Sequence, residues 1–218
     1  MPKNAACPND TNPEKPRIKF NPTAPNPKIE IFNTYVEIKN IEKVLKNPSK
    51  PVLAIIGGSK VSTKLNILKK LTEKVDTIIL GGGIANTFLL SSNLPIGKSL
   101  AEKNMVSDVK EILRLAKKND VLIPLPKDVM CQSLTGIRNK NVNEVLKEDY
   151  IKDIGSKTSI IYEKLIKEAA TILWNGPVGV FEDALFENGT KNIARSIGNT
   201  KALTIAGGGA VSYTHLTL

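Results

Sequence analysis

Two lysines beside a pair of glycines form the segment with the clearest chemical potential, Gly57-Gly58-Ser59-Lys60-Val61-Ser62-Thr63-Lys64. Glycine has no Cβ, so the backbone here can approach an anion closely. The pattern predicts a helix directly afterwards, and a helix N-terminus offers free N–H groups and a positive dipole end. Lys60 and Lys64 are four residues apart and would share one helical face. The segment therefore predicts a phosphoryl-binding site, with a glycine turn before a solvated helix as the alternative.

A second segment, residues 174–182, reads Trp-Asn-Gly-Pro-Val-Gly-Val-Phe-Glu and is dense in special residues. Its glycines and Pro177 impose an unusual backbone path. Asn175 and Glu182 can hydrogen-bond hydroxyls or amides, and a ribose hydroxyl is a natural partner for Glu182. The alternative is a tight loop that merely buries its Trp and Phe.

Two further glycine segments do not complete the motifs they suggest. Residues 96–99, Ile-Gly-Lys-Ser, resemble the end of a P-loop, but Ser92 stands where that motif requires glycine. Residues 81–86 fail the dinucleotide fingerprint, because Asn86 stands at the position of the last glycine. The sequence therefore contains neither a P-loop nor the dinucleotide-binding fingerprint.

Strands and helices are predicted to alternate along the chain. Apolar runs and helical spacing predict strands at residues 52–56, 75–80, 121–124, 171–174 and 202–206, and helices at 35–45, 61–71, 84–90, 107–118, 158–169 and 190–197. A polar stretch through residue 143 leaves room for one more strand. This alternation predicts an α/β fold, an open, mostly parallel sheet with helices on both faces, of the Rossmann-like nucleotide-binding type.

Glycine clusters follow four of these predicted strands directly, at residues 57–58, 81–83, 176–179 and 207–209. Ligands of open α/β sheets bind beyond the carboxyl ends of the strands. Four glycine loops on that edge would form a backbone-lined floor for a nucleotide.

Composition limits the remaining functions. The chain has 218 residues, 41% hydrophobic and 24% charged, with a net charge of +10. Its lysines are scattered, without the aromatic basic stripe that stacks bases, so nucleic-acid binding is only a remote alternative. Two distant cysteines, Cys7 and Cys131, and one histidine, His215, predict neither a disulfide framework nor a metal site. No signal-peptide or membrane-length apolar run occurs, which favours a cytoplasmic protein.

Several separated motifs, in order, resemble one family. Residues 53–89, LAIIGGSKVSTKLNILKKLTEKVDTIILGGGIANTFL, closely resemble the start of the C-terminal domain of bacterial phosphoglycerate kinase. WNGPVGVFE at residues 174–182 is similar to a second signature of that family. Asp153-Ile154-Gly155 and Gly207-Gly208-Gly209 also fit. The resemblance covers roughly residues 35–209.

The resemblance implies a role for each matched position. Lys60 is similar to the lysine that stabilises the transferring phosphoryl group, and Lys64 to the lysine that holds the nucleotide phosphates. The other implied nucleotide contacts are Gly58, Ser59, Gly83 (at the adenine side), Asn175, Pro177, Glu182 (at the ribose), Gly207, Gly208 and Gly209. The family transfers a phosphoryl group between 1,3-bisphosphoglycerate and ADP with Mg²⁺, usually as a monomer without nucleic-acid or membrane partners.

The sequence also departs from the family. Nothing before residue 35 resembles the family's phosphoglycerate-binding domain, and Arg17 is the only arginine there. The family's metal-placing Asp and the hydroxyl residue after it are replaced by Ala210 and Val211. We therefore expect a chain truncated at both ends: a Pro/Asn-rich tail at 1–28, the nucleotide-binding domain at 29–209 and a non-family tail at 210–218. Two readings stay open, a kinase half and an ADP/ATP-binding fragment without activity.

Overall fold

The computed structural model describes residues 29–32 and 47–207. The predicted tails at 1–28 and 210–218, the predicted helix at 35–45, and Gly208 and Gly209 lie outside these residues. Ten strands and helices build the larger part: β1 Ile29–Phe32, β2 Val52–Ile56, α2 Leu65–Leu71, β3 Thr77–Leu80, α3 Gly82–Ser91, α4 Val106–Lys118, α5 Ser156–Glu168, β7 Thr171–Asn175, α6 Asn188–Gly198 and β8 Leu203–Gly207. Three strands build the smaller part: β4 Asp128–Ser133, β5 Gly136–Asn141 and β6 Tyr150–Ile154. Short 3₁₀ turns occur at Lys103–Met105 and Val142–Glu144.

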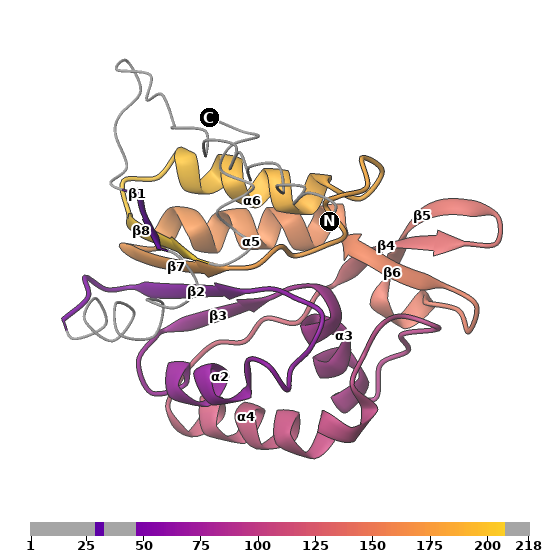
Figure 1. Cartoon of the computed structure of the whole chain (residues 1–218), viewed down its shortest axis with the longest axis horizontal. Coiled ribbons are helices and arrows are strands. Elements are labelled where there is room, and N and C mark those ends of the chain that lie inside the picture. Colours follow the sequence, from indigo (N-terminus) through magenta and orange to yellow (C-terminus); the bar gives the residue numbers. More distant parts are fainter. Residues whose placement is uncertain (1–28, 33–46, 208–218) are drawn as a thin grey trace, which may run out of the picture.

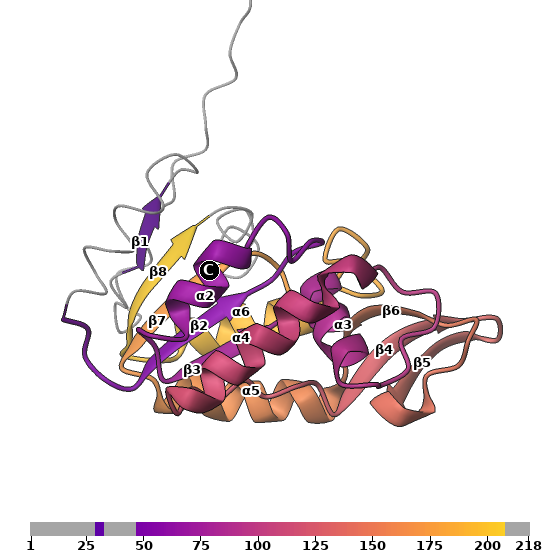
Figure 2. The ribbon, with the colours of Figure 1, turned by 90° about the horizontal axis from the view of Figure 1, so that it is seen from below.

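The main sheet is parallel and has the order β1-β8-β7-β2-β3. Helices α5 and α6 cover one face, and α2 and α4 cover the other (Figure 1, with α2 and α4 in front in Figure 2). The sequence prediction of a mostly parallel sheet with helices on both faces is confirmed. Strand β1, which pairs with β8 at the edge, was not predicted.

Central strand β2 is buried along its whole length, which explains its unbroken apolar run. Its alternate residues serve two separate cores, because successive side chains of a strand point to opposite faces. Ile56 packs with Leu68 of α2 and Ile112 of α4. Ile55 packs on the other face with Tyr162 of α5 and Ile193 of α6.

A second, antiparallel sheet has the order β5-β4-β6. It lies at the end of the molecule next to α3 (Figures 1 and 2). Val129 and Cys131 of β4 pack on Leu89 of α3 in a small third core. The sequence prediction allowed for one strand in the polar stretch through residue 143, whereas the structure contains two there, β4 and β5. Strand β6, which follows that stretch, was not predicted.

The strand predicted at residues 121–124 is wrong. Only Leu122 forms a β-bridge, to Thr77 of β3. The Leu122 carbonyl accepts from Ile78 N at 2.8 Å, and Leu122 N donates to Asp76 O at 3.0 Å. The pairing stops there because Pro124 and Pro126 have no N–H to donate.

Two buried aspartates fix the starts of α5 and α6. The Asp128 carboxylate accepts from Lys157 N at 3.0 Å, Thr158 N at 2.7 Å and Asn139 Nδ2 at 2.9 Å. Burial raises the pKa of this carboxyl, but the hydrogen bonds outweigh it and hold the pKa below its ordinary value. Asp153 holds the start of α6 through Gly189 N at 2.6 Å. The small sheet is therefore tied to the helices that cover the main sheet.

Candidate functional site

The glycine clusters gather at one edge of the main sheet. Strands β8, β7, β2 and β3 are parallel neighbours, and their last residues lie in register at Gly207, Asn175, Ile56 and Leu80. The chain leaves the carboxyl ends of β2, β3 and β7 through Gly57, Gly81 and Gly176. The prediction that these clusters share an edge is confirmed for the residues described.

Three of these loops pack directly against one another. A methyl group at Gly57 would lie 1.8 Å from the Pro177 carbonyl oxygen, and one at Gly83 would lie 2.2 Å from the Ser59 oxygen. Gly82 N donates to Val178 O at 2.8 Å. The close approach that the sequence predicted between Gly57 and an anion is instead an approach to neighbouring backbone, and Gly83 likewise approaches backbone.

Gly58 is different, because its Cβ position is open. The nearest atom would be Ile84 Cδ1 at 3.8 Å, while its φ of +133° disfavours other residues. Its surroundings therefore leave room for another molecule beside the backbone.

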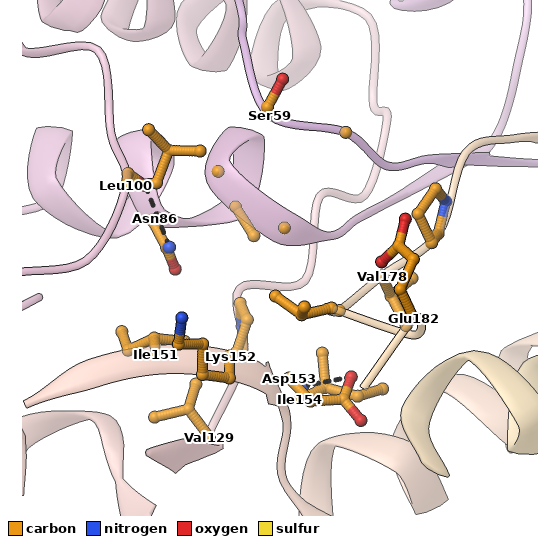
Figure 3. Close-up of a pocket in the computed structure, with 18 residues that line it drawn as sticks. Ser59, Asn86, Leu100, Val129, Ile151, Lys152, Asp153, Ile154, Val178 and Glu182 are labelled. Atoms are coloured by element: carbon orange, nitrogen blue, oxygen red, sulfur yellow. Dashed lines mark hydrogen bonds between the residues drawn. The ribbon is translucent and has the colours of Figure 1, made fainter. Parts of the chain in front are cut away.

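The loops enclose a cavity of about 360 Å³ with the small sheet on its far side. Figure 3 shows Ser59 and the start of α3 above the cavity, β6 below it and Val178 and Glu182 at its side. Five of the predicted site residues line it, namely Gly58, Ser59, Gly83, Pro177 and Glu182. The sequence reasoning missed others, among them Asn86, Leu100, Val129, Ile151, Lys152 and Asp153 as a lining residue.

Lys64 and Asn175 meet beside the loops. The Lys64 ammonium donates to Asn175 Oδ1 at 2.6 Å, although 111 residues separate them. Asn175 is buried at the last position of β7, and Lys64 is half-buried just before α2. The pair places a fixed positive charge near the carboxyl ends of β2 and β7.

Lys60 does not share a helical face with Lys64, so that expectation is wrong. Helix α2 begins at Leu65, and a turn closed by Lys64 N and Val61 O at 2.8 Å precedes it. Glu102 stabilises this turn, since its carboxylate accepts from Ser62 N at 2.8 Å and Ser62 Oγ at 2.6 Å. These hydrogen bonds, led by that from the Ser62 hydroxyl, lower the pKa of Glu102, and the nearby Lys60 charge adds to the effect. Lys60 itself is exposed.

Asp153 is a buried carboxyl that reaches the cavity wall from the end of β6. It accepts from Gly189 N at 2.6 Å and Ile154 N at 2.8 Å. Methyl groups at Gly179 or Gly189 would each lie 2.2 Å from Asp153 Oδ1, so both segments enclose it tightly. Burial raises the pKa of Asp153 to about 7, against the lowering by the two N–H donors.

The remaining predicted residues lie elsewhere. Gly207 is buried at the end of β8 and does not line the cavity, as β7 separates β8 from β2. Glu182 is exposed at the cavity rim. In the described ranges 29–32 and 47–207, no cluster of three His, Cys, Asp or Glu side chains is arranged to hold a metal. Within the same ranges, no helix is long and apolar enough to cross a bilayer.

This sheet order, with a glycine-lined cavity at its carboxyl edge, defines an open α/β domain with a ligand site at the usual place for that class. The sequence profile of phosphoglycerate kinase matches residues 32–215. The chain belongs to the phosphoglycerate kinase family. The matched range extends past residue 209, and the three domain boundaries expected from the sequence stay predictions.

Individual proteins of this family also match the chain. The chain is 45% identical over 177 residues to a phosphoglycerate kinase of Desulfovibrio desulfuricans, which covers 79% of this chain and 46% of the relative. The structure of phosphoglycerate kinase from Coxiella burnetii matches with a TM-score of 0.77 at 40% identity, over 82% of this chain and 48% of that one. The enzyme from Pyrococcus horikoshii OT3 shares the fold, with a TM-score of 0.70 at 24% identity over 84% and 48%. The chain thus spans about half the length of these relatives.

Proposed function

We propose that this chain forms the nucleotide-binding half of a phosphoglycerate kinase. The reaction moves a phosphoryl group between 1,3-bisphosphoglycerate and ADP and yields 3-phosphoglycerate and ATP in glycolysis. The observation that carries the proposal is the glycine-lined cavity at the carboxyl edge of β2, β3 and β7, with the Lys64–Asn175 pair beside it. Membership of the family supports the class of reaction.

In this proposal the two lysines neutralise phosphate charge. Lys64, held by Asn175 Oδ1, binds the nucleotide phosphates. Lys60 is exposed on the loop that Glu102 holds through Ser62, so its ammonium is free to reach a phosphoryl group in transfer. Phosphoryl transfer depends mainly on positioning and charge stabilisation, which ammonium groups can supply.

The nucleoside would occupy the cavity between the glycine loops and β6. Gly58 and Ser59 would contact the phosphate side, Gly83 the adenine side, and Pro177 a neighbouring wall. Glu182, at the rim, would accept hydrogen bonds from the ribose hydroxyls. Gly207, Gly208 and Gly209 would contribute backbone N–H groups to the phosphates from β8.

Mg²⁺ would enter with the nucleotide. Mg²⁺ keeps several waters and binds through substrate phosphates plus one or two carboxylates, so it does not require the cluster of three ligands that is absent from residues 29–32 and 47–207. When bound, it neutralises phosphate charge and orients the phosphates. Ala210 stands where the resemblance implies the metal-placing Asp, so this chain would offer the metal less support.

A second candidate function is ADP/ATP binding without turnover. One observation favours it: Ala210 stands where the resemblance implies a metal-placing Asp. Under either candidate we propose a cytoplasmic monomer whose partners are the nucleotide and, for the kinase, phosphoglycerate.

One pair of measurements tests the proposal. Titration calorimetry with ADP and Mg²⁺ should give saturable binding at about one site per chain, and its absence would refute the nucleotide site. A coupled assay of ATP formation from ADP and 1,3-bisphosphoglycerate then separates the candidates. Turnover supports the kinase, whereas ADP binding without turnover supports the second candidate.

A further inference from the structure

Glu102 lies between α3 and α4 and connects that part of the chain to the Lys60 loop, residues 57–64. Its two carboxylate oxygens have different donors: Oε2 accepts from Ser62 N at 2.8 Å, and Oε1 accepts from Ser62 Oγ at 2.6 Å. The two residues are 40 positions apart in the sequence. A carboxylate that accepts two hydrogen bonds from one residue fixes the orientation of that residue as well as its distance.

The backbone of Glu102 is itself held in place. Glu102 N donates to Thr87 Oγ1 at 3.1 Å, and the fully buried Thr87 of α3 donates in turn to Gly83 O at 2.8 Å. The Glu102 carbonyl accepts from Met105 N at 3.0 Å. The carboxylate therefore extends from a fixed backbone, and it defines the position of Ser62 relative to α3.

Lys60 lies between two attachments of its loop to the α3 part of the molecule. On its N-terminal side, the Gly58 carbonyl accepts from Ile84 N of α3 at 3.2 Å. On its C-terminal side is the Glu102 carboxylate. The Lys60 side chain is exposed, and its neighbour Ser59 lies over the cavity in Figure 3. The segment that carries Lys60 is thus fixed at both ends beside the cavity.

The turn after Lys60 also has contacts that do not involve Glu102. Lys64 N donates to Val61 O at 2.8 Å, and Thr63 Oγ1 donates to Lys60 O at 2.8 Å. Val61 is fully buried in the core between the main sheet and helices α2 and α4. Because these contacts close and anchor the turn, the carboxylate is left to set where the Lys60 side chain begins.

The charge of Glu102 opposes anion binding. The hydrogen bond from the Ser62 hydroxyl lowers the pKa of Glu102, and the nearby Lys60 charge adds to the effect, so the carboxylate is ionised at neutral pH. A negative charge near a phosphate-binding lysine repels phosphate. A carboxylate at this place therefore favours phosphate binding only through the position that it gives to the lysine.

We propose that Glu102 is a positioning residue for Lys60, and that its contact with Ser62 sets how strongly this chain binds ATP relative to ADP. This inference rests on the proposed nucleotide site, in which Lys60 contacts the phosphoryl group in transfer. That group is the terminal phosphate of ATP and is absent from ADP. Misplacing Lys60 should therefore weaken ATP, while Lys64 still binds the phosphates that both nucleotides share.

Titration calorimetry of the full chain with ATP and with ADP, with Mg²⁺ present throughout, tests the inference. Glu102→Ala should weaken ATP about tenfold and ADP about twofold or less, because it releases both Ser62 hydrogen bonds. Glu102→Gln should rescue ATP binding to within about threefold of the wild type, since its amide can accept from Ser62 N and donate to Ser62 Oγ. The exposed Glu73→Ala is the matched control and should change neither affinity.

The direction of the change separates position from charge. If Glu102 acted only through its charge, Glu102→Ala would strengthen ATP, the more negative nucleotide. Lys60→Met removes the ammonium itself and should also weaken ATP selectively. Adding Glu102→Ala to Lys60→Met should cause no further loss, because the two residues act through one contact with the ligand.

Stronger or unchanged ATP binding in Glu102→Ala, equal weakening of ATP and ADP, or additive losses in the double variant would overturn the inference. If Glu102→Ala does not fold, Ser62→Ala decides, because it removes one of the two hydrogen bonds and no charge. It should weaken ATP about threefold and leave ADP unchanged, and unchanged ATP binding would overturn the inference. Wild-type binding of ADP without ATP would overturn it too, whereas binding of neither nucleotide would refute the proposed function.

Discussion

At the scale of single residues, the site is built on backbone contact between loops. Gly57 and Gly83 are required where the backbones of the β2, β3 and β7 loops touch. Gly58 alone of these three has an open Cβ position. The three glycines therefore have different roles: Gly57 and Gly83 allow the loops to pack, and Gly58 leaves room beside the cavity.

Gly57→Ala should destabilise the protein by about 3 kcal/mol or more, because its methyl group would lie 1.8 Å from Pro177 O, a backbone atom. The free energy of unfolding in urea measures this effect. Gly136→Ala is the control for an added methyl group without a clash, since no atom lies within 4 Å of its Cβ position; its φ of +104° adds a backbone strain that Gly57 does not have. It should cost about 1–2 kcal/mol. Equal losses in the two variants would contradict the packing role of Gly57.

Asp153 should make stability depend on pH. Its pKa in the folded state is about 7, against an ordinary value of 3.8. Between those values the folded state retains a proton that the unfolded chain has lost, so stability falls as pH rises from about 4 to 7. The full loss would be on the order of 4 kcal/mol.

Asp153→Asn mimics the protonated carboxyl and removes this titration. Thermal unfolding from pH 5 to 8 should show a smaller decline in melting temperature for the variant than for the wild type. An equal decline in melting temperature in the two proteins would contradict this prediction. It would mean that the Gly189 and Ile154 N–H groups stabilise the Asp153 carboxylate as well as water does.

At the scale of elements, small polar strands connect the cavity to the helices. Asp128 at the start of β4 caps α5, and Asp153 at the end of β6 holds α6. The small sheet thus both lines the cavity and fixes the helices on one face of the main sheet.

Asp128→Ala should lower stability by about 3 kcal/mol or more, because it leaves the N–H groups of Lys157 and Thr158 and the Asn139 amide without their acceptor. Urea unfolding at pH 7 measures the loss, and the exposed Glu73→Ala serves as control. Since the pKa of Asp128 is lowered, its contribution is present at neutral pH and disappears as pH falls through the folded-state pKa. A cost below 1 kcal/mol would contradict the capping role.

Four strands of the main sheet, β2, β3, β7 and β8, could be predicted because each has a mostly apolar run with glycine at or just after its end. Strand β1 was not predicted, because its four residues, Ile-Glu-Ile-Phe, form no such run. The small sheet could not be predicted, because β5 is Gly-Ile-Arg-Asn-Lys-Asn and is mostly exposed. No hydrophobic pattern in the sequence indicates its pairing with β4 across a short turn.

The residues of the cavity could likewise be predicted only where they follow a predicted strand. Gly58 and Pro177 follow predicted strands, whereas Lys152 lies in an unpredicted one and Asn86 inside a helix.

At the scale of the whole molecule, two cores on opposite faces hold the parallel sheet, and a third joins the small sheet to α3. The cavity lies where the two sheets approach each other, and residues from β2, α3, β6 and the loop after β7 reach it. Residues far apart in sequence, such as Lys64 and Asn175, meet only because β2 and β7 are neighbours.

The central claim is that Lys64 binds the phosphates of a nucleotide held in this cavity. The most direct measurement compares the affinities for ADP and adenosine in the wild type, Lys64→Met and the exposed control Lys74→Met. Loss of a charged hydrogen-bond donor should weaken ADP by about tenfold to a hundredfold and leave adenosine nearly unchanged. Lys74→Met should match the wild type. Equal loss of ADP and adenosine affinity in Lys64→Met, or unchanged ADP binding, would contradict the account.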